Sequence, residues 1–156
     1  MISEAVGFAP EEIDPTVSTR AARLKWVIVV NSGLPAGRAV NAAICAAAAT
    51  STAVTGLLGE DAVDAGGSRH PGLPWAGCSI LAADTSTLRT IRDKAAVGFG
   101  CFVADMPAAA QQTRVYADYL ATVKETPADE IEYYAVSVVG PRKQVDKIVG
   151  KLPLMP

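Results

Sequence analysis

The segment from Lys25 to Asn31, with the sequence KWVIVVN, is the feature that most constrains the fold. It is rich in β-branched residues and almost continuously apolar, which is typical of a central strand covered on both faces. A cluster of Ser, Gly and Pro at 32–37 ends this strand, and an alanine-rich stretch follows. Because alanine has the highest helix propensity, we predict a helix over about 36–58. Val40, Ile44, Ala47 and Ser51 fall on one stripe of it.

The same alternation of strand and helix continues along the chain. Further apolar segments predict strands at 78–83, 101–105 and 132–139. The segments after them predict helices at 88–97, from Pro107 to about Val123, and from Pro141 onward. Asp84 is placed to cap the first of these three helices. The β-α-β-α-β-α-β-α order predicts a single α/β domain, a sandwich with a largely buried sheet.

Two segments stand apart from this alternation. We predict that residues 1–23 form an N-terminal extension on a domain that spans 24–156. The extension has no sustained apolar period, and one short helical turn is expected after Pro10. Residues 59–77 are rich in Gly, Pro, Asp and Ser, and loops of this length without structure are usually functional or disordered.

Charge and hydropathy limit the partners. The chain has 14 basic and 16 acidic side chains and a formal net charge of −2. Nucleic-acid binders usually have a basic excess, because neutralising phosphates supplies most of their affinity, so a nucleic-acid partner is not favoured. The longest apolar run, at 42–49, is far short of the ~20 residues of a membrane span, so no membrane partner is expected.

The cysteines and the single histidine predict neither a metal site nor a cofactor. Cys45, Cys78 and Cys101 are widely spaced, and a zinc site needs four ligands from this small set. Each lies among apolar residues and is expected to be buried, which is typical of a cytoplasmic, reducing environment. His70 lies in the long loop, where the sequence shows no general-base partner.

The turn before the alanine-rich helix is a candidate anion site. Free backbone N–H groups at Gly37 and the helix dipole attract negative charge, and Arg38 adds a bidentate donor. Asn31 and Asn41 flank this turn as candidate ligand-binding residues. The glycine spacing matches neither common nucleotide-binding pattern, and the segment also fits a tight turn with a solvated arginine.

Asp105 closes a predicted strand, and ligands of α/β sheets bind at the carboxyl ends of the strands. Thr113 is a further polar residue near this edge. Each residue also has a purely structural interpretation. Asp105 could cap the next helix, and Thr113 could make a hydrogen bond that only supports the fold.

Both ends of the predicted domain, 24–156, carry a family resemblance. The strand at 25–31, the loop with Leu34, Gly37 and Arg38, and the alanine-rich helix resemble the opening of type II peptidyl-tRNA hydrolases. The run AVSVVGPRKQVDKIVGKLPL at 135–154 resembles the end of that family. The family's Gln and His are missing from 39–45, and an extra helix follows Asp105. This pattern resembles an uncharacterised, mostly bacterial family of unknown function that shares the hydrolase fold.

The resemblance implies a three-layer α/β sandwich with a four-stranded mixed sheet, often as a homodimer. The chemistry that the family implies is hydrolysis of the ester that joins a peptide to tRNA, although the net charge of −2 does not favour tRNA as a partner. The family's functional lysine, aspartate and threonine would fall on Arg38, Asp105 and Thr113. We therefore expect a hydrolase for an anionic or ester substrate, in which Arg38 holds the anion and Asp105 orients or activates water. The alternative is a non-catalytic module that binds a small molecule or a protein in the same crevice.

Overall fold

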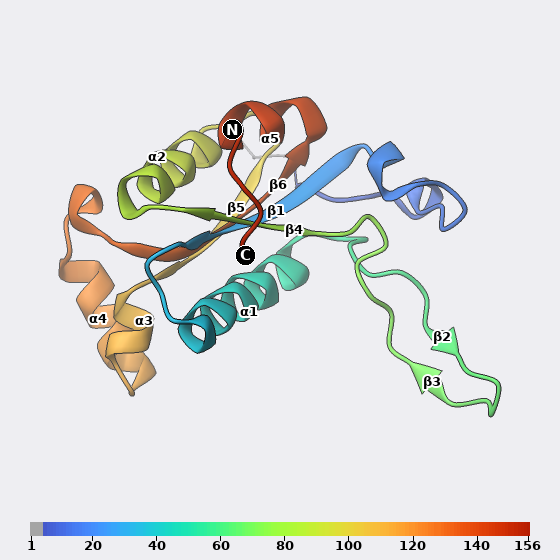
Figure 1. Cartoon of the computed structure of the whole chain (residues 1–156), viewed down its shortest axis with the longest axis horizontal. Helices are drawn as coiled ribbons and strands as arrows, with labels where there is room; N and C mark the ends of the chain where they lie inside the picture. The colour runs from blue at the N-terminus through green and yellow to red at the C-terminus, as the bar shows by residue number, and fades with distance from the viewer. Residues whose placement is uncertain (1–4) are drawn as a thin grey trace.

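The computed structural model describes residues 5–156, so the first four residues of the predicted extension lie outside it (Figure 1). Its centre is a four-stranded sheet with the order β4-β1-β6-β5. The strands are β1 (Leu24–Asn31), β4 (Ser79–Ala83), β5 (Phe102–Pro107) and β6 (Tyr133–Pro141). β4 is parallel to β1, whereas β6 is antiparallel to β1 and to β5. The predicted α/β fold with a four-stranded mixed sheet is confirmed.

Helices cover both faces of this sheet (Figure 1). One face packs against α1, and the opposite face packs against α2 and α5. Two shorter helices, α3 and α4, follow the end of β5. The helices are α1 (Ala36–Ala53), α2 (Thr85–Ala96), α3 (Ala109–Gln112), α4 (Tyr116–Glu125) and α5 (Arg142–Val149).

The apolar run of β1 supplies both cores, because alternate side chains of a strand point to opposite faces. Trp26 and Ile28 belong to the cluster on the α1 side, whereas Val27 and Val29 belong to the cluster with α2 and α5. Val27 and Val29 are completely buried. A strand covered on both faces has no polar side to show, which explains its continuous hydrophobicity.

The buried stripe of α1 is not the one marked by its larger side chains. Ala39, Ala42 and Ala46 are at most 1% exposed, whereas Val40 and Ile44 are 55% and 61% exposed. Small side chains let the helix lie close to the sheet. Close packing on this narrow stripe therefore leaves the valine and the isoleucine outside.

A chain of buried hydrogen bonds also fixes this orientation of α1. The indole Nε1 of Trp26 donates to Ser137 Oγ at 2.8 Å, and Ser137 Oγ lies 2.7 Å from Thr50 Oγ1. Thr50 Oγ1 in turn donates to the carbonyl of Ala46 at 2.8 Å. Because Thr50 uses its hydrogen there, the Ser137 hydroxyl donates to Thr50, and each polar group in the chain has a partner. Turning α1 to bury Ile44 would break this chain.

α1 ends at Ala53 and not near residue 58 as predicted. Val54 is extended, and the amide of Phe8 donates to the carbonyl of Thr55 at 2.9 Å. Gly56 follows with a φ of +75°, where a Cβ would lie 2.7 Å from the Phe8 carbonyl oxygen. The helix therefore ends here because the residues after it pair with the segment around Phe8.

The single helix predicted from Pro107 to Val123 is also wrong. β5 continues to Pro107 through a register shift after Met106, and two short helices follow. α3 stops at Thr113, which is extended and donates its hydroxyl to the carbonyl of Ala109 at 2.9 Å. Threonine hydroxyls compete in this way with the backbone bonds that would continue a helix.

Residues 59–77 form an arm that projects from the body (Figure 1). It contains the short strands β2 (Ala62–Val63) and β3 (Arg69–His70), which pair antiparallel. The turn between them is held by Asp64, whose carboxylate accepts from the amides of Gly66 and Ser68 at 2.9 and 3.0 Å. The sequence did not predict this hairpin, because its strands have no hydrophobic alternation.

Residues 5–23 of the predicted N-terminal extension pack on the rest of the chain. The expected turn is present as a 3-10 helix at Pro10–Glu12, and a second one covers Thr19–Ala21. Phe8 is buried and its ring centroid lies 4.8 Å from that of Trp75. The Glu12 carboxylate accepts from Arg23 Nε at 2.6 Å.

Candidate functional site

The carboxyl ends of β1, β4 and β5 lie at one edge of the sheet, where α/β proteins bind ligands. Asn31 ends β1 there, but both ends of its amide are already used. Its Nδ2 donates to Thr85 Oγ1 at 3.0 Å, and its Oδ1 accepts from the amide of Gly33 at 2.9 Å. Asn31 therefore ties the end of β1 to the start of α2.

Arg38 and Asn41 lie together on the exposed first turns of α1, beside α3. Gln111 of α3 joins them, because its Nε2 donates to the Arg38 carbonyl at 2.9 Å and to Asn41 Oδ1 at 3.1 Å. The sequence did not indicate Gln111, since the bond depends on the unexpected break after α3. At Gly37 a Cβ would meet no atom within 4 Å, so no close approach requires glycine there.

Asp105 lies on the opposite face of the sheet from Arg38. Phe102 and Met106 of β5 pack in the cluster with α1, whereas Val103 packs in the cluster with α2. Strand alternation puts Asp105 on the Val103 side, where its Oδ2 accepts from Arg92 Nε of α2 at 3.4 Å.

The structure thus brings Arg38 and Asn41 together and separates them from Asp105. Thr113 lies at the end of α3, where its hydroxyl is bonded to the backbone. The placement of Asp105 within a strand also excludes the alternative that it caps a helix. The catalytic roles of Arg38, Asp105 and Thr113 stay predictions, but these residues form no common set of contacts.

Side chains from three other elements, α2, α4 and β6, lie near Asp105. Burial raises the pKa of Asp105, and the Arg92 guanidinium opposes this effect by lowering that pKa. Arg92 Cζ lies 5.8 Å from the ring centroid of Tyr133 in β6. Burial also raises the pKa of Tyr119 in α4, and the Asp105 charge adds to that shift. A half-buried carboxyl group with a raised pKa can hold or release a proton, which is the property that marks candidate catalytic acids.

Sequence reasoning missed Arg92, Tyr119 and Tyr133. One signal was available for Arg92. The apolar period of α2 turns Leu88, Ile91 and Ala95 toward the sheet, so Arg92 flanks that face. No signal placed α4 and its tyrosine beside β5.

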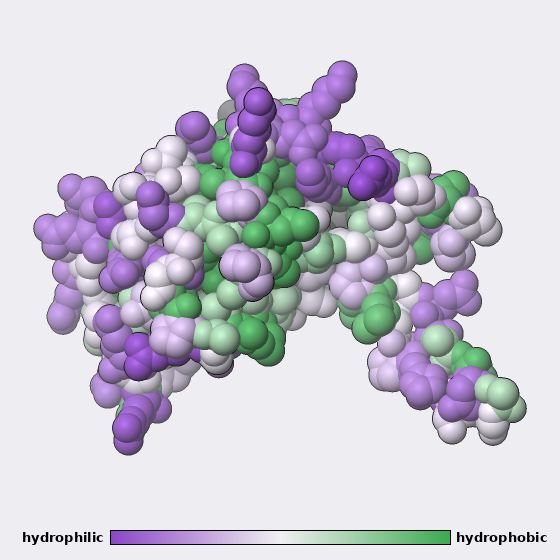
Figure 2. Space-filling model, in the orientation of Figure 1, coloured by the Kyte–Doolittle hydropathy of each residue, from purple (hydrophilic) through white to green (hydrophobic). Residues whose placement is uncertain are grey.

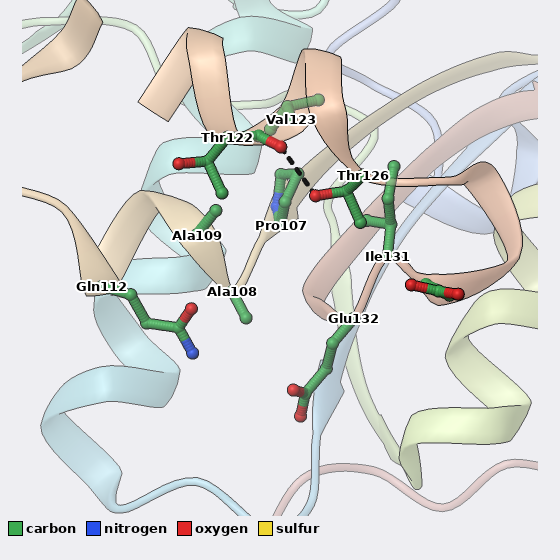
Figure 3. A pocket seen from close by; sticks show the side chains of 10 residues that line it. Pro107, Ala108, Ala109, Gln112, Thr122, Val123, Thr126, Ile131 and Glu132 are labelled. Carbon is green, nitrogen blue, oxygen red and sulfur yellow. Dashed lines mark hydrogen bonds between the residues drawn. The ribbon is translucent and has the colours of Figure 1, made fainter. Parts of the chain in front are cut away.

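A small pocket of about 170 Å³ lies where β5 ends, between α3, α4 and the segment before β6 (Figure 3). Thr126 Oγ1 donates to the Thr122 carbonyl at 2.6 Å on its wall. Glu130 and Glu132 contribute the only carboxylates of its lining, and no basic residue lines it. This charge disfavours an anion, and none of the predicted site residues lines the pocket.

A larger cavity of about 820 Å³ lies between the N-terminal extension and the turn after α2. Its charged lining residues, Glu12 and Arg23, are paired with each other. Phe99 and Cys101 also line it. This cavity is likewise separate from the predicted site residues.

The cysteines and the histidine do not form a reactive centre. Cys45 is exposed, so its predicted burial is wrong, whereas Cys78 and Cys101 are half-buried. Burial raises the pKa of the Cys78 thiol to about 12, which keeps it protonated. His70 lies on the arm with its Nε2 3.3 Å from Asp64 Oδ2.

The described part of the chain has neither a cluster of metal-binding side chains nor a membrane-spanning helix. Within residues 5–156, no three His, Cys, Asp or Glu side chains gather in a way that could hold a metal ion. None of the helices in the same residues has the length and hydrophobicity to cross a membrane.

Comparisons with known proteins agree with this fold and assign no activity. The solved structure of a protein of unknown function from Agrobacterium tumefaciens is similar, with a TM-score of 0.78 and 17% sequence identity. The match covers 86% of this chain and 98% of that chain, and at this identity it shows the fold alone. No curated protein matches the chain.

The family comparison confirms part of the predicted resemblance. Neither comparison names the type II peptidyl-tRNA hydrolase fold, so that likeness stays a prediction. Residues 24–156 match the family described as protein of unknown function DUF2000. The chain therefore belongs to the DUF2000 family.

Proposed function

We propose that this protein is a non-catalytic binding protein that acts through its surface. The observation that carries this proposal is the position of Arg38 and Asp105 on opposite faces of the sheet. A general base and an anion-holding group must both reach one substrate, each within hydrogen-bond distance. Two groups with a packed sheet between them do not meet that requirement.

The other predicted site residues support the same conclusion. Asn31, Asn41 and Thr113 each make a hydrogen bond within the protein, so their polar groups already serve the fold. In contrast, the outer face of α1 and the arm at 59–77 expose apolar side chains to solvent. Exposed apolar surface of this kind favours a macromolecular partner over a small anion.

A second candidate function has one observation in its favour. The raised pKa of Asp105 suits acid–base chemistry on an ester, with Arg92 beside it in the place expected of Arg38. The substrate would then approach from the α2 side of β5, next to Tyr119 and Tyr133.

Hydrolysis assays on the full chain separate these functions. A panel of p-nitrophenyl esters and a peptidyl-tRNA mimic are offered to the wild type, Asp105→Asn and Arg38→Gln, with Asp93→Asn as an exposed control. We expect no turnover above that of buffer for any variant. Turnover lost only in Asp105→Asn would establish the second candidate. Turnover lost in both Asp105→Asn and Arg38→Gln would establish the shared hydrolase site and overturn the proposal.

A further inference from the structure

The sheet ends in two edge strands, β4 and β5, and the C-terminal segment of the chain covers β4. The amide of Ala82 donates to the carbonyl of Pro153 at 3.0 Å. The amide of Met155 donates to the carbonyl of Ile80 at 2.9 Å, and Figure 1 shows this segment passing over β4. Figure 2 shows hydrophobic side chains gathered in the middle of this side of the molecule. The chain therefore protects one edge of its sheet with its own backbone.

The register of the sheet shows which backbone groups of β5 point away from it. In an antiparallel pair, residues that exchange hydrogen bonds alternate with residues that do not. The amide of Arg142 donates to the carbonyl of Arg23, so the even-numbered residues of β6 bond to β1 and its odd-numbered residues bond to β5. The partners of these odd-numbered residues are Phe102, Ala104 and Met106. The N–H and C=O groups of Val103 and Asp105 therefore point outward.

The outer edge of β5 is open. No backbone group within residues 5–156 bonds to the outward groups of Val103 and Asp105. Residues 102–105 are half-buried, whereas β6 is buried from Tyr133 to Gly140. Pro107 has the next outward position, where its missing N–H costs the sheet no hydrogen bond. The free edge thus offers alternating donors and acceptors up to Asp105.

The carboxyl end of this edge is acidic. Residues 108–132, which follow β5, carry five acidic and two basic side chains. The small pocket that begins at Pro107 has Glu130 and Glu132 in its lining and no basic residue (Figure 3). Both glutamates are exposed, and neither forms an ion pair with any of residues 5–156.

The two arginines of α2 on this side do not balance the negative charge. Arg92 lies 3.4 Å from Asp105 and 3.8 Å from Asp93, so it is shared between two carboxylates. Arg89 donates to the carbonyl of Ile131 at 3.1 Å. With the two pocket glutamates there are four carboxylates for two arginines, which leaves an excess of negative charge beside the open edge.

We propose that β5 binds an extended basic peptide of another protein as an added strand. The peptide backbone bonds to the outward groups of Val103 and Asp105, and a Lys or Arg side chain at the end near Pro107 meets Glu130 and Glu132. Main-chain hydrogen bonds supply the affinity of such a contact, and side-chain contacts supply the selectivity. This inference rests on the proposed binding function and names its partner.

A second copy of β5 does not have the required chemistry. The strand has the sequence FVADMP, without a basic residue. Antiparallel pairing of two such edges would put both Asp105 carboxylates on one face of the joined sheet, and like charges across strands are destabilising. A charge and a proline on an edge also disfavour indiscriminate strand addition, which a basic peptide that ends its pairing at Asp105 avoids.

Selection from a random heptapeptide library displayed on phage, with the full chain as bait, tests the partner chemistry. We expect the selected peptides to be rich in β-branched residues and to carry Lys or Arg toward one end. Absence of any selected peptide, or selection of peptides without a basic residue, would overturn the proposal.

Backbone methylation of the best selected heptapeptide tests strand addition. Only alternate residues of an added strand bond to β5, so methylating that set of amides should raise Kd by about tenfold or more, since two hydrogen bonds are lost. Methylating the other set should change Kd by less than about threefold, which makes it the matched control. NMR should also show slower amide exchange at Val103 and Asp105 in the complex. Equal losses for the two sets, or unchanged exchange at both residues, would place the peptide elsewhere.

Paired charge removals in the protein test the acidic end. Glu130→Gln with Glu132→Gln should raise the Kd of the same heptapeptide by about three- to tenfold, because two exposed charge contacts are lost. Glu125→Gln with Asp129→Asn is the matched control, since it removes the same charge from exposed residues outside the pocket. All four positions are exposed, and circular dichroism checks that both double variants fold. The same loss in both double variants would refute the assigned role of the pocket glutamates.

Failure here is distinguishable from failure of the proposed function. A chain that selects no basic peptide and shows no hydrolytic turnover loses this partner and stays a binding protein for another class of partner. A chain that binds the peptide and also shows turnover that depends on Asp105 overturns the proposed function and keeps the peptide site.

Discussion

Replacing Ser137 by alanine tests the buried hydrogen bonds that orient α1. Ser137 is completely buried in β6, and its hydroxyl links the Trp26 indole to the Thr50 hydroxyl at 2.8 and 2.7 Å. The substitution removes one oxygen atom and little volume. It leaves the indole N–H without an acceptor in a site that water does not reach.

The expected cost follows from these two contacts. An unsatisfied buried donor costs about 1–3 kcal/mol, and the lost bond to Thr50 adds about 0.5–1.5 kcal/mol. We therefore expect Ser137→Ala to lower the free energy of unfolding by about 2–3 kcal/mol. For a chain of this size, each kcal/mol lowers Tm by about 2–4 °C, so Tm should fall by about 4–12 °C.

Calorimetry and urea unfolding measure this change. Ser51→Ala is the matched control, since Ser51 is exposed on the same helix and its loss should change stability by at most about 0.5 kcal/mol. The double variant Thr50→Val, Ser137→Ala should lose less unfolding free energy than the sum of the two single losses, because the two residues share one bond. A Tm of Ser137→Ala equal to that of Ser51→Ala would refute the assigned role of this chain of bonds.

Two further predictions concern a helix cap and two glycines. Asp84 Oδ1 accepts from the Thr87 amide at 2.8 Å, and bonds from Thr87 and Ser86 lower the Asp84 pKa below 3.8. The cap therefore stabilises the fold above that pH and is lost as pH falls through the lowered pKa. Asp84→Ala should lower Tm at neutral pH, and calorimetry should show the difference from wild type shrinking in acid; a constant difference would contradict it. Gly140→Ala should destabilise by about 1–3 kcal/mol, because its Cβ would lie 2.6 Å from Cys101 Sγ. Gly37→Ala should instead stabilise by about 0.4–1 kcal/mol, since its Cβ enters open space in α1. Urea unfolding of Gly140→Ala and Gly37→Ala checks whether the first lowers and the second raises the free energy of unfolding. Equal changes in the two variants would be inconsistent with this geometry.

The sequence predicts the centre of the sheet well because β1 and β6 are buried on both faces. The apolar run at 25–31 has no polar side, so it fits little else than a central strand. Helix boundaries were less predictable, since they depend on contacts between distant segments. α1 ends where the chain pairs with Phe8, and propensity alone does not show that contact.

The candidate site was predicted less well, because spacing along a chain does not give the face of a sheet. Asp105 and Arg38 both belong near the same edge, but the alternation of β5 turns Asp105 toward α2. The stripe predicted on α1 is not the buried one, for a related reason. Side-chain size suggested Ile44, whereas close packing and the need to satisfy Thr50 selected the alanines.

The pKa of the Asp105 carboxyl group, measured by NMR, tests the separation of Arg38 from Asp105 most directly. The wild-type value should lie above 3.8, because burial raises it. Arg92→Gln should raise it further by removing the guanidinium that lowers it. Arg38→Gln should leave it unchanged, since the sheet lies between the two groups. An equal rise in Arg38→Gln and Arg92→Gln would put Arg38 beside Asp105 and contradict this account.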